Sequence, residues 1–385
     1  MGGEVLKKLF VIICMIGICL AQRVYGDEDM QLNAKSAVLI DAENGRMLYG
    51  KNEREKLPMA STTKIMTCII AIENGKMDEV VEVSDYAASM PDVQLNINKG
   101  EKYYLKDLLY SLMLESHNDT AVAIAEHIGG SVEGFAGMMN EKAYSIGAFD
   151  THFVTPNGLD SDEHYSTAYD MALIASYALE NDIFMEVINT PSHTFSDIDG
   201  KRSFTVNNKD AFLGMMDGAV GVKTGFTGNA GYCFVGAVYK DDKKFVSAVL
   251  ASGWPPHKTY KWQDTIKLMN YGNDNYEHRK IFDGSEYYRE IQVDDGIDDN
   301  VGVYSYGYED ILVSDKDIIE VKEVLNEKIS APVNKNQVVG KLVIKINSEK
   351  YREYCIKSCE YIRRKTYVWE LKRIYSCFLL DFFHN

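Results

Sequence analysis

Residues 58–67 read PMASTTKIMT, and this stretch decides how the rest of the chain is interpreted. The apolar spacing that follows predicts a helix over 62–73, with Ser61 at its start and Lys64 one turn later on the same face. A serine hydroxyl is a poor nucleophile until a base removes its proton. A lysine can be that base when burial or a neighbouring cation lowers its pKa. The alternative is that Ser61 only caps the helix, because serine is favoured there for backbone reasons.

A second pattern, Ser116-His117-Asn118, lies between helices predicted over 105–114 and 120–128. A short loop at this place can present a hydroxyl and a carboxamide to a cleft. Ser116 is then suited to relay a proton to a leaving amine, and Asn118 to hold a substrate amide. The alternative is again capping, of the second of these helices.

A third pattern, Lys223-Thr224-Gly225, ends a predicted strand. An edge strand can take up an extended peptide as a further strand. Lys223 would supply a positive charge for a terminal carboxylate, Thr224 a hydroxyl donor, and Gly225 the room for close approach. The N–H groups of Ser61 and Phe226 would together form an oxyanion hole. The alternative for Lys223 is a solvated surface charge.

Strands and helices are ordered around these patterns as in an α+β domain. Strand-like runs near both ends enclose a long helical block, so the sheet must join distant parts of the chain. We predict strands over 37–41, 47–49, 204–206, 218–223, 232–239 and 245–250, and further helices over 132–146, 167–179 and 259–271. A domain boundary is predicted at 272–275. Beyond it, short strand-like runs over 281–346 indicate a small β-rich second domain.

The overall composition limits the classes of protein to which the chain can belong. With 385 residues, 46% of them hydrophobic, the chain is long enough for two or three domains. Its formal net charge of −16 argues against a general nucleic-acid-binding function, because no net positive field attracts phosphates. The sequence has no His-Glu-x-x-His run and no glycine-rich phosphate loop. We therefore expect neither a metal nor an organic cofactor.

The first 26 residues have the pattern of a secretory signal peptide. Lys7 and Lys8 precede an apolar run over 9–21, which is too short to span a bilayer comfortably as a helix. Small residues follow, and we predict cleavage near Gly26 and therefore export of the protein. The alternative is a buried N-terminal helix.

Residues 351–385 carry a charge opposite to that of the rest of the chain. They contain seven Lys/Arg and four Asp/Glu, a net charge of +3, which leaves −19 for the remainder. We predict an amphipathic helix that lies on a membrane surface without crossing it, because no run of about 20 apolar residues is present there. The alternative is a helix docked on the β-rich domain. The predicted apolar stripe comprises Val368, Leu371, Ile374, Tyr375, Phe378, Leu379 and Phe382.

The three patterns, together with the run TPNGL at 155–159, resemble those of the penicillin-recognising serine enzymes. Within that superfamily the chain is similar over nearly its whole length to the low-molecular-weight penicillin-binding proteins, which are serine-type D-alanyl-D-alanine carboxypeptidases. The resemblance implies a transpeptidase- and β-lactamase-like catalytic domain over 27–275, made of an antiparallel sheet and a helical subdomain. It also implies a β-rich domain over 276–350 and a basic amphipathic anchor helix over 351–385.

The same resemblance implies a role for each residue of the patterns. Ser61 would be the acylated nucleophile, Lys64 its base and Ser116 the proton shuttle. Substrate would be bound by Asn118, Lys223, Thr224, Gly225, Phe226 and Lys261. Two positions depart from the family: His117 stands where Gly or Ala is common, and Lys261 stands near the place of an arginine. Lys261 would therefore meet a substrate carboxylate only as a point charge.

The implied reaction is attack of Ser61 on the amide between the two terminal D-alanines of a peptidoglycan stem peptide, followed by hydrolysis of the acyl-enzyme by water. β-Lactams would react covalently with the same serine, and the enzyme would act at the outer face of the cytoplasmic membrane. A class A β-lactamase shares all three patterns, but the chain lacks the Glu-x-x-Leu-Asn run of that class. A cell-wall-binding protein without activity is a second alternative, and the complete catalytic set argues against it.

Overall fold

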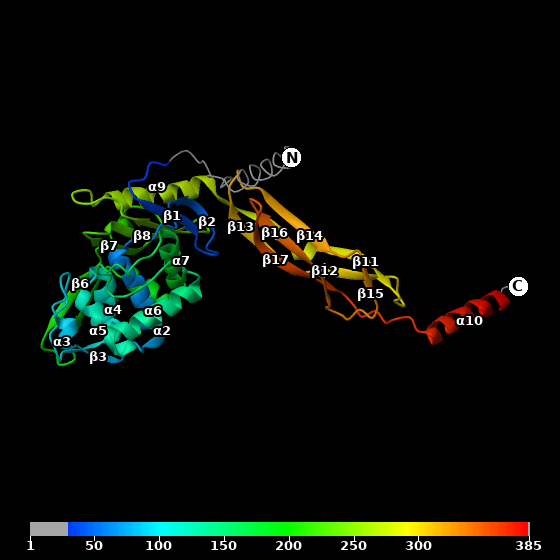
Figure 1. Ribbon diagram of the computed structural model, residues 1–385, viewed down its shortest axis with the longest axis horizontal. Helices are drawn as coiled ribbons and strands as arrows, with labels where there is room; N and C mark the ends of the chain where they lie inside the picture. Colours follow the sequence, from blue (N-terminus) through cyan, green and yellow to red (C-terminus); the bar gives the residue numbers. More distant parts are fainter. Residues whose placement is uncertain (1–29, 384–385) are drawn as a thin grey trace, which may run out of the picture.

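Five antiparallel strands form the sheet of the first domain, and they come from both ends of its sequence (Figure 1). The computed structural model describes residues 30–383. The strand order is β2-β1-β9-β8-β7, so that β1 near the start of the domain pairs with β9 near its end, as Ala37 opposite Val249 shows. The strands are β1 (Ser36–Asp41), β2 (Met47–Lys51), β7 (Ala219–Thr227), β8 (Gly231–Lys240) and β9 (Lys243–Leu250).

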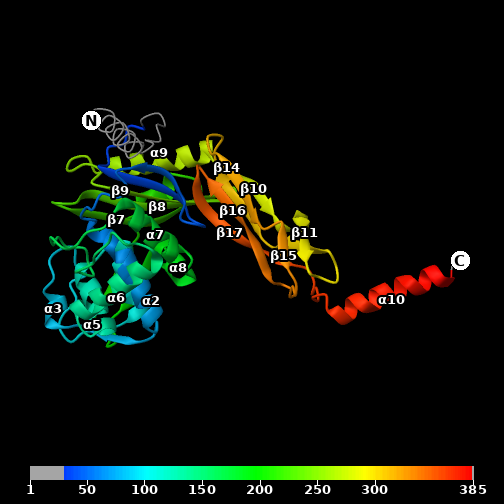
Figure 2. The ribbon, with the colours of Figure 1, turned by 45° about the vertical axis from the view of Figure 1, so that its right-hand side comes forward.

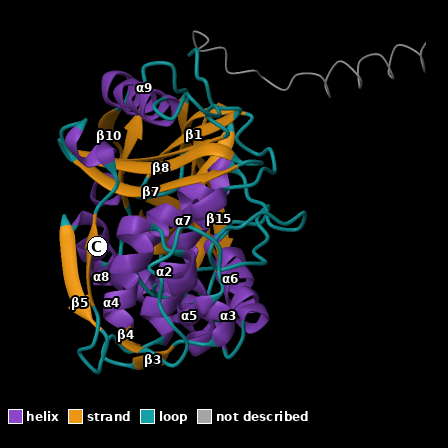
Figure 3. Ribbon diagram, turned by 90° about the vertical axis from the view of Figure 1, so that its left-hand side faces the viewer, coloured by secondary structure: helices purple, strands orange, loops and turns teal. Residues whose placement is uncertain are grey.

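Helices cover both faces of this sheet (Figure 3). In β1, Val38 and Ile40 belong to the core shared with the helical block, whereas Ala37 and Leu39 belong to the core beneath α9 (Tyr260–Asn275). This division follows from the strand itself, because successive side chains point to opposite faces. The helical block contains α2 (Lys64–Asn74), α3 (Asp85–Ala88), α4 (Leu105–Tyr110), α5 (Asn118–Gly129), α6 (Val132–Ile146), α7 (Ala168–Leu179) and α8 (Asp182–Asn189).

Short elements complete the first domain. The 3₁₀ turn η1 (Ala60–Thr63) leads directly into α2, and the π-helical turn η2 (Ser111–Glu115) follows α4. The remaining short elements are β3 (Val80–Glu82), β4 (Lys102–Tyr104), β5 (Ser192–Ser196), β6 (Ser203–Asn207) and η3 (Ala211–Gly214).

The predicted α+β architecture is confirmed, and three local details differ from the prediction. The helix expected over 105–114 changes into the π-helical turn η2 at Ser111, and the sequence did not indicate α8. The helix predicted over 259–271 continues as α9 to Asn275, so the second domain starts with β10 at Glu277, directly after the boundary predicted at 272–275. Gly272 serves packing there, because a Cβ at this position would lie 2.9 Å from Cδ2 of Leu39 on the sheet.

The second domain is built of antiparallel strands, with one parallel pair (β11–β15) at the edge of its larger sheet (Figure 2). A six-stranded sheet has the order β14-β16-β17-β12-β11-β15, and a separate pair joins β10 to β13. The strands are β10 (Glu277–Asp283), β11 (Tyr288–Asp294), β12 (Asn300–Ser305), β13 (Tyr308–Val313), β14 (Ile319–Leu325), β15 (Lys328–Ser330), β16 (Val338–Ile346) and β17 (Glu349–Ser358); the turn η4 (Gly284–Glu286) lies between β10 and β11.

The tail helix begins later than the sequence predicted. Residues 351–358, assigned to the tail, continue strand β17, which pairs with β16 and buries Ile356 completely. Ile362 is also buried and forms an isolated bridge with Val333, so the chain stays on the β-rich domain up to this point. The helix α10 (Tyr367–Phe383) follows. The prediction erred because the strongly charged segment 349–357 lacks the apolar alternation by which a half-buried strand is recognised.

Helix α10 extends away from the β-rich domain in both views (Figures 1 and 2). Several of its described apolar side chains are solvent-exposed, among them Val368, Leu371 and Ile374, whereas Trp369 is half-buried. Within residues 30–383, no helix combines the length and apolar character needed to cross a membrane. The predicted signal peptide over 1–26 lies outside the described residues.

Asp264 holds the start of the domain to α9, and its loss should destabilise the fold. Its buried carboxylate accepts hydrogen bonds from the backbone N–H groups of Asn33 (3.0 Å) and Ala34 (2.7 Å) and from the hydroxyl of Ser252 (2.8 Å). Asp264→Ala would leave these donors without their acceptor, at a cost of about 3 kcal/mol. Urea unfolding of the variant measures this loss. The neighbouring exposed Gln263, changed to Ala, is the control, and equal stability of the two variants would contradict the assignment.

Candidate active site

Ser61 lies in a strained turn that is held from two sides. The preceding residue, Ala60, is buried and has a φ of +50°, a conformation that costs a non-glycine residue free energy. The hydroxyl of Thr63 donates to the carbonyl oxygen of Ala60 at 2.8 Å. Gly158, with a φ of +83°, presses against the same carbonyl, because a Cβ there would lie only 2.0 Å from the oxygen. The loop around 155–159 therefore positions the serine.

His164 supports this turn from behind and is a residue that the sequence did not indicate. Its Nδ1 accepts the backbone N–H of Val154 at 2.9 Å, so Nε2 carries the proton and donates to the hydroxyl of Thr63, also at 2.9 Å. Burial lowers the pKa of His164 to about 4, which keeps the ring neutral. His164 is thus a neutral support for the turn and does not act as a base.

Lys64 has three hydrogen-bonding neighbours around its terminal nitrogen. Nζ lies 2.9 Å from Oγ of Ser61, 2.8 Å from Oδ1 of Asn118 and 2.7 Å from the carbonyl oxygen of Asn157. The amide group of Asn118 is oriented by its Nδ2, which donates to two carbonyl oxygens, those of Pro91 and Asp92. Two of the three neighbours of Lys64 can therefore only accept, and the third is a hydroxyl that can donate.

This arrangement fits an uncharged amine. A neutral amine can donate two N–H groups to Asn118 and Asn157 and turn its lone pair to the hydroxyl of Ser61, whereas a charged amine would donate to all three oxygens. Complete burial, followed by the positive charge of Lys223, lowers the pKa of Lys64 well below its usual value, while the carboxylate of Asp119 opposes the shift. Lys64 thus combines a lowered pKa with a hydrogen-bonding distance to Ser61.

The second pattern follows the π-helical turn η2. Ser116 adopts a left-handed conformation with a φ of +69°, and its buried Oγ has no hydrogen-bond partner among the described residues. It lines a cavity of about 50 Å³ together with Lys223 and Thr224. His117 is buried and its Nδ1 lies 2.8 Å from the hydroxyl of Ser111, so it braces the loop and makes no hydrogen bond to Ser61 or Lys64.

The third pattern lies on β7 at the edge of the described sheet, but the strand does not end there as predicted and continues to Thr227. Gly225 packs against the serine turn, because a Cβ there would lie 3.0 Å from the backbone N of Ser61. Tyr232, the β8 partner of Phe226, uses its own N–H and C=O on the opposite side, toward Gly253 and Ser252. The backbone groups of Phe226 therefore have no partner in β8 and point to the free edge of β7.

Lys223 is buried, and two nearby charges, those of Asp210 and Lys261, act on its pKa in opposite directions. Its Nζ donates to the carbonyl oxygen of Thr224 at 3.1 Å. Burial lowers its pKa to about 7; Asp210 opposes this shift and Lys261 adds to it. Lys261, on α9, is also buried, which lowers its pKa, and it lies over the rings of Tyr232 and Trp262. The sequence did not indicate Asp210 as part of this group.

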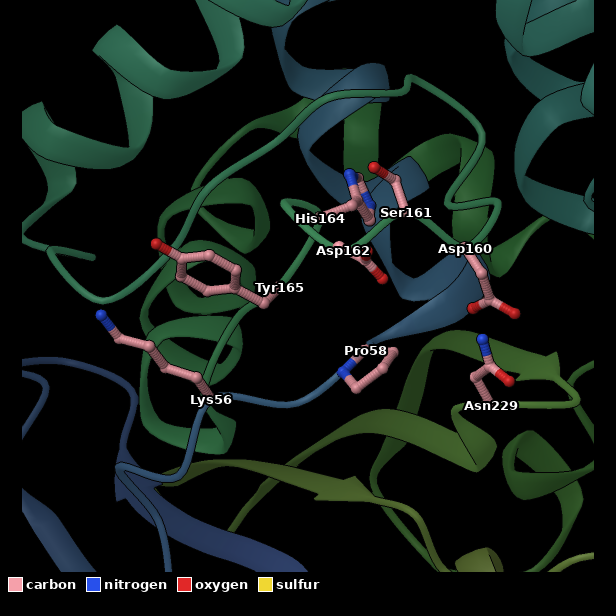
Figure 4. Close-up of a pocket in the computed structure, with 8 residues that line it drawn as sticks. All are labelled: Lys56, Pro58, Asp160, Ser161, Asp162, His164, Tyr165 and Asn229. Atoms are coloured by element: carbon pink, nitrogen blue, oxygen red, sulfur yellow. The ribbon is translucent and has the colours of Figure 1, made fainter.

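A larger hollow of about 410 Å³ lies at the far end of β7 (Figure 4). There the hydroxyl of Thr227 donates to Asp160 at 2.7 Å, and the side chains of Asp160 and Asn229 lie close together in the view. The hollow is lined by Lys56, Pro58, Asp160, Ser161, Asp162, His164, Tyr165 and Asn229. It contains none of the residues of the three patterns, so the groups able to perform chemistry lie beside it and not in it.

The structure thus brings the three patterns into one site, joined by hydrogen bonds from Lys64 and by the cavity beside Lys223. A serine beside a buried lysine, next to an edge strand that carries Lys-Thr-Gly, is typical of the penicillin-recognising serine hydrolases. The chain belongs to the D-alanyl-D-alanine carboxypeptidase family, whose model matches residues 23–253. A second model, described as the C-terminal domain of penicillin-binding protein 5, matches residues 276–364.

Known relatives agree with this family. The D-alanyl-D-alanine carboxypeptidase DacF of Bacillus subtilis is 32% identical over 348 residues, which cover 88% of each chain. The crystal structure of the carboxypeptidase DacD of Francisella tularensis has a TM-score of 0.70 at 25% identity and covers 91% of this chain and 98% of its own. Penicillin-binding protein 5 of Haemophilus influenzae shares the fold, with a TM-score of 0.73. The protein is a serine-type D-alanyl-D-alanine carboxypeptidase, and the β-lactamase alternative is not favoured.

The charge of Lys223 predicts an alkaline fall of kcat/KM on a free-acid peptide. Activity should fall as pH increases through about 7, because Lys223 then loses the positive charge that would attract the carboxylate. Lys223→Arg should remove the alkaline fall, because a guanidinium is not deprotonated. An alkaline fall that stays at the parent pH in this variant would exclude Lys223 as its cause.

Proposed function

We propose that Ser61 is the acylated nucleophile and that neutral Lys64 is its base. Ser61 Oγ attacks the carbonyl carbon of the penultimate D-alanine while its proton passes to Nζ of Lys64, 2.9 Å away. The observation that carries this proposal is the hydrogen-bond pattern around Lys64, in which the two other neighbours, Asn118 and Asn157, both accept. The lone pair of the neutral amine is thereby left for the serine.

The tetrahedral intermediate needs donors for its negatively charged oxygen. The N–H of Ser61 lies beside Gly225, and the N–H of Phe226 points to the same free edge, so the two groups can converge on one oxygen. When the intermediate collapses, the C–N bond breaks and the leaving amine of D-alanine takes a proton, which Ser116 relays. Water then hydrolyses the ester on Ser61 and restores the free enzyme.

The substrate binds along β7 with its carboxylate at Lys223. The free backbone groups of this edge pair with an extended peptide, and Thr224 adds a hydroxyl donor near the carboxylate. With the carboxyl end at Lys223, the peptide runs antiparallel to β7, and its earlier residues pass Thr227 toward the hollow of Figure 4. Asn118 holds a substrate amide, and Lys261 adds positive charge behind Lys223.

The nucleophile is tested by labelling with a fluorescent penicillin and by release of D-alanine. Ser61→Ala should abolish both while leaving the fold intact, because no other hydroxyl lies beside Lys64 within the described residues. Ser145→Ala, a change at an exposed serine of α6, is the control and should label like the parent. Continued release of D-alanine by Ser61→Ala at a rate near the parent's would refute the assignment.

The protein is further proposed to be exported and to lie on the outer face of the cytoplasmic membrane through α10. The signal pattern of residues 1–26 supports export. The exposed apolar side chains of α10, among them Leu371 and Tyr375, support contact with a membrane surface, because docking on the β-rich domain, the alternative, would bury them. Basic residues near a charged surface contribute about 1 kcal/mol each. Those of this segment are Arg363, Arg364, Lys365, Lys372 and Arg373.

Removal of residues 366–385 tests the anchor and spares the bridge that Ile362 makes with the β-rich domain. The truncated protein should leave the membrane fraction and still react with penicillin. The pair Leu371→Glu and Ile374→Glu should do the same, whereas Glu370→Gln, a change at a polar position of the helix, should remain bound. A full-length protein that is already free of membranes, or a truncated one that still sediments with them, would disprove the anchor.

A further inference from the structure

Asp210 is an acidic side chain that the reaction described above does not use. It precedes η3, where its Oδ1 accepts the backbone N–H of Phe212 at 3.0 Å and caps the turn. Its other oxygen, Oδ2, is buried and has no hydrogen-bond partner among the described residues. Capping needs only one oxygen, so the position of the second oxygen calls for another explanation.

The unpartnered oxygen faces the carboxylate-binding end of β7. A Cβ on Gly221 would lie 3.3 Å from Oδ2, and Lys223 follows two residues later on the same face of the strand. Asp210 and Lys223 line the same cavity of about 50 Å³, together with Ser116. Little solvent separates charges in so small a space, so their interaction is stronger than on the open surface.

The other charges around this cavity leave Asp210 as the anion for Lys223. Lys209 and Glu115 also line the cavity, but they pair with each other at 3.0 Å, and Glu115 in turn faces His117. Lys261 on α9 is a further cation; burial raises the pKa of Asp210 to about 6, and the positive charges of Lys223 and Lys261 oppose this shift. When two buried lysines lie close together, the positive charge of each lowers the pKa of the other, and a nearby carboxylate offsets this effect.

We propose that Asp210 is a positioning residue for substrate recognition, which keeps Lys223 in the charged state that binds the terminal carboxylate. The proposal rests on the carboxylate-binding role of Lys223 stated above. It follows that Asp210 acts through the binding of the free-acid substrate and not through the chemical step at Ser61. Protonation of Asp210 below about pH 6 has little effect, because Lys223 is already charged there.

Asp210→Asn tests the proposal, since the amide oxygen still caps η3 while the negative charge is lost. The alkaline fall of kcat/KM on a free-acid D-alanyl-D-alanine peptide should move to lower pH by roughly one unit. At pH 8 this is roughly a tenfold loss, mostly in KM, whereas near pH 5.5 variant and parent should be alike. Asp210→Glu should restore the parent profile. Asp217→Asn, at an exposed aspartate before the same strand, is the matched control.

A loss of activity that is equal at every pH, or an alkaline fall that does not move in a folded Asp210→Asn protein, would overturn the proposal. Asp210→Ser also keeps a capping oxygen and replaces the Asn variant if that variant does not fold. The Lys223→Arg variant distinguishes a wrong assignment of Asp210 from a wrong assignment of Lys223. If the arginine variant removes the alkaline fall but Asp210→Asn does not shift it, only the assignment of Asp210 is wrong.

Discussion

The burial of Lys64 between three oxygen atoms is the interaction on which the active site depends. Its Nζ joins the serine turn, the second pattern through Asn118 and the loop of Asn157, segments that are far apart in the sequence. A charged lysine in this position would need a buried counter-ion, and the three direct neighbours are all uncharged. Complete burial within the helical block lowers the pKa of Lys64 and so favours the neutral amine that the proposed mechanism needs.

The proposed mechanism also requires that a second buried lysine, Lys223, keeps its positive charge in order to bind the substrate carboxylate. Burial and the positive charge of Lys223 lower the pKa of Lys64, whereas for Lys223 the carboxylate of Asp210 counteracts the lowering of its pKa by burial and by Lys261. The sheet allows the two lysines to have different surroundings, because Lys223 lies on the edge strand β7, where it lines the same cavity as Asp210. Gly225 and Gly158 let this strand and the loop approach the serine turn closely enough for the groups to act on one bond.

The sequence predicted the parts of the site that lie in short local patterns, and it missed the parts that only the fold brings near. Ser61 and Lys64 are one turn apart, so helix geometry alone places them together. His164 and Asp210 carry no local signal, because one acts through a hydrogen bond to a residue 101 positions away and the other through burial beside a strand. Within the TPNGL run, the useful atom of Asn157 is a backbone oxygen, which residue identity does not reveal. The tail boundary was missed because charged residues fill both β17 and the segment after it.

The protonation state of Lys64 in the free enzyme tests most directly whether this lysine can act as the base for Ser61. Protein labelled with ¹³C at the lysine ε-carbons, compared with a Lys64→Met variant to assign the signal, can be titrated by NMR in the absence of substrate. The Lys64 signal should titrate well below the ordinary lysine range, because burial lowers the pKa of this amine. A Lys64 signal that titrates near the usual pKa of 10.5 would contradict a neutral base beside Ser61.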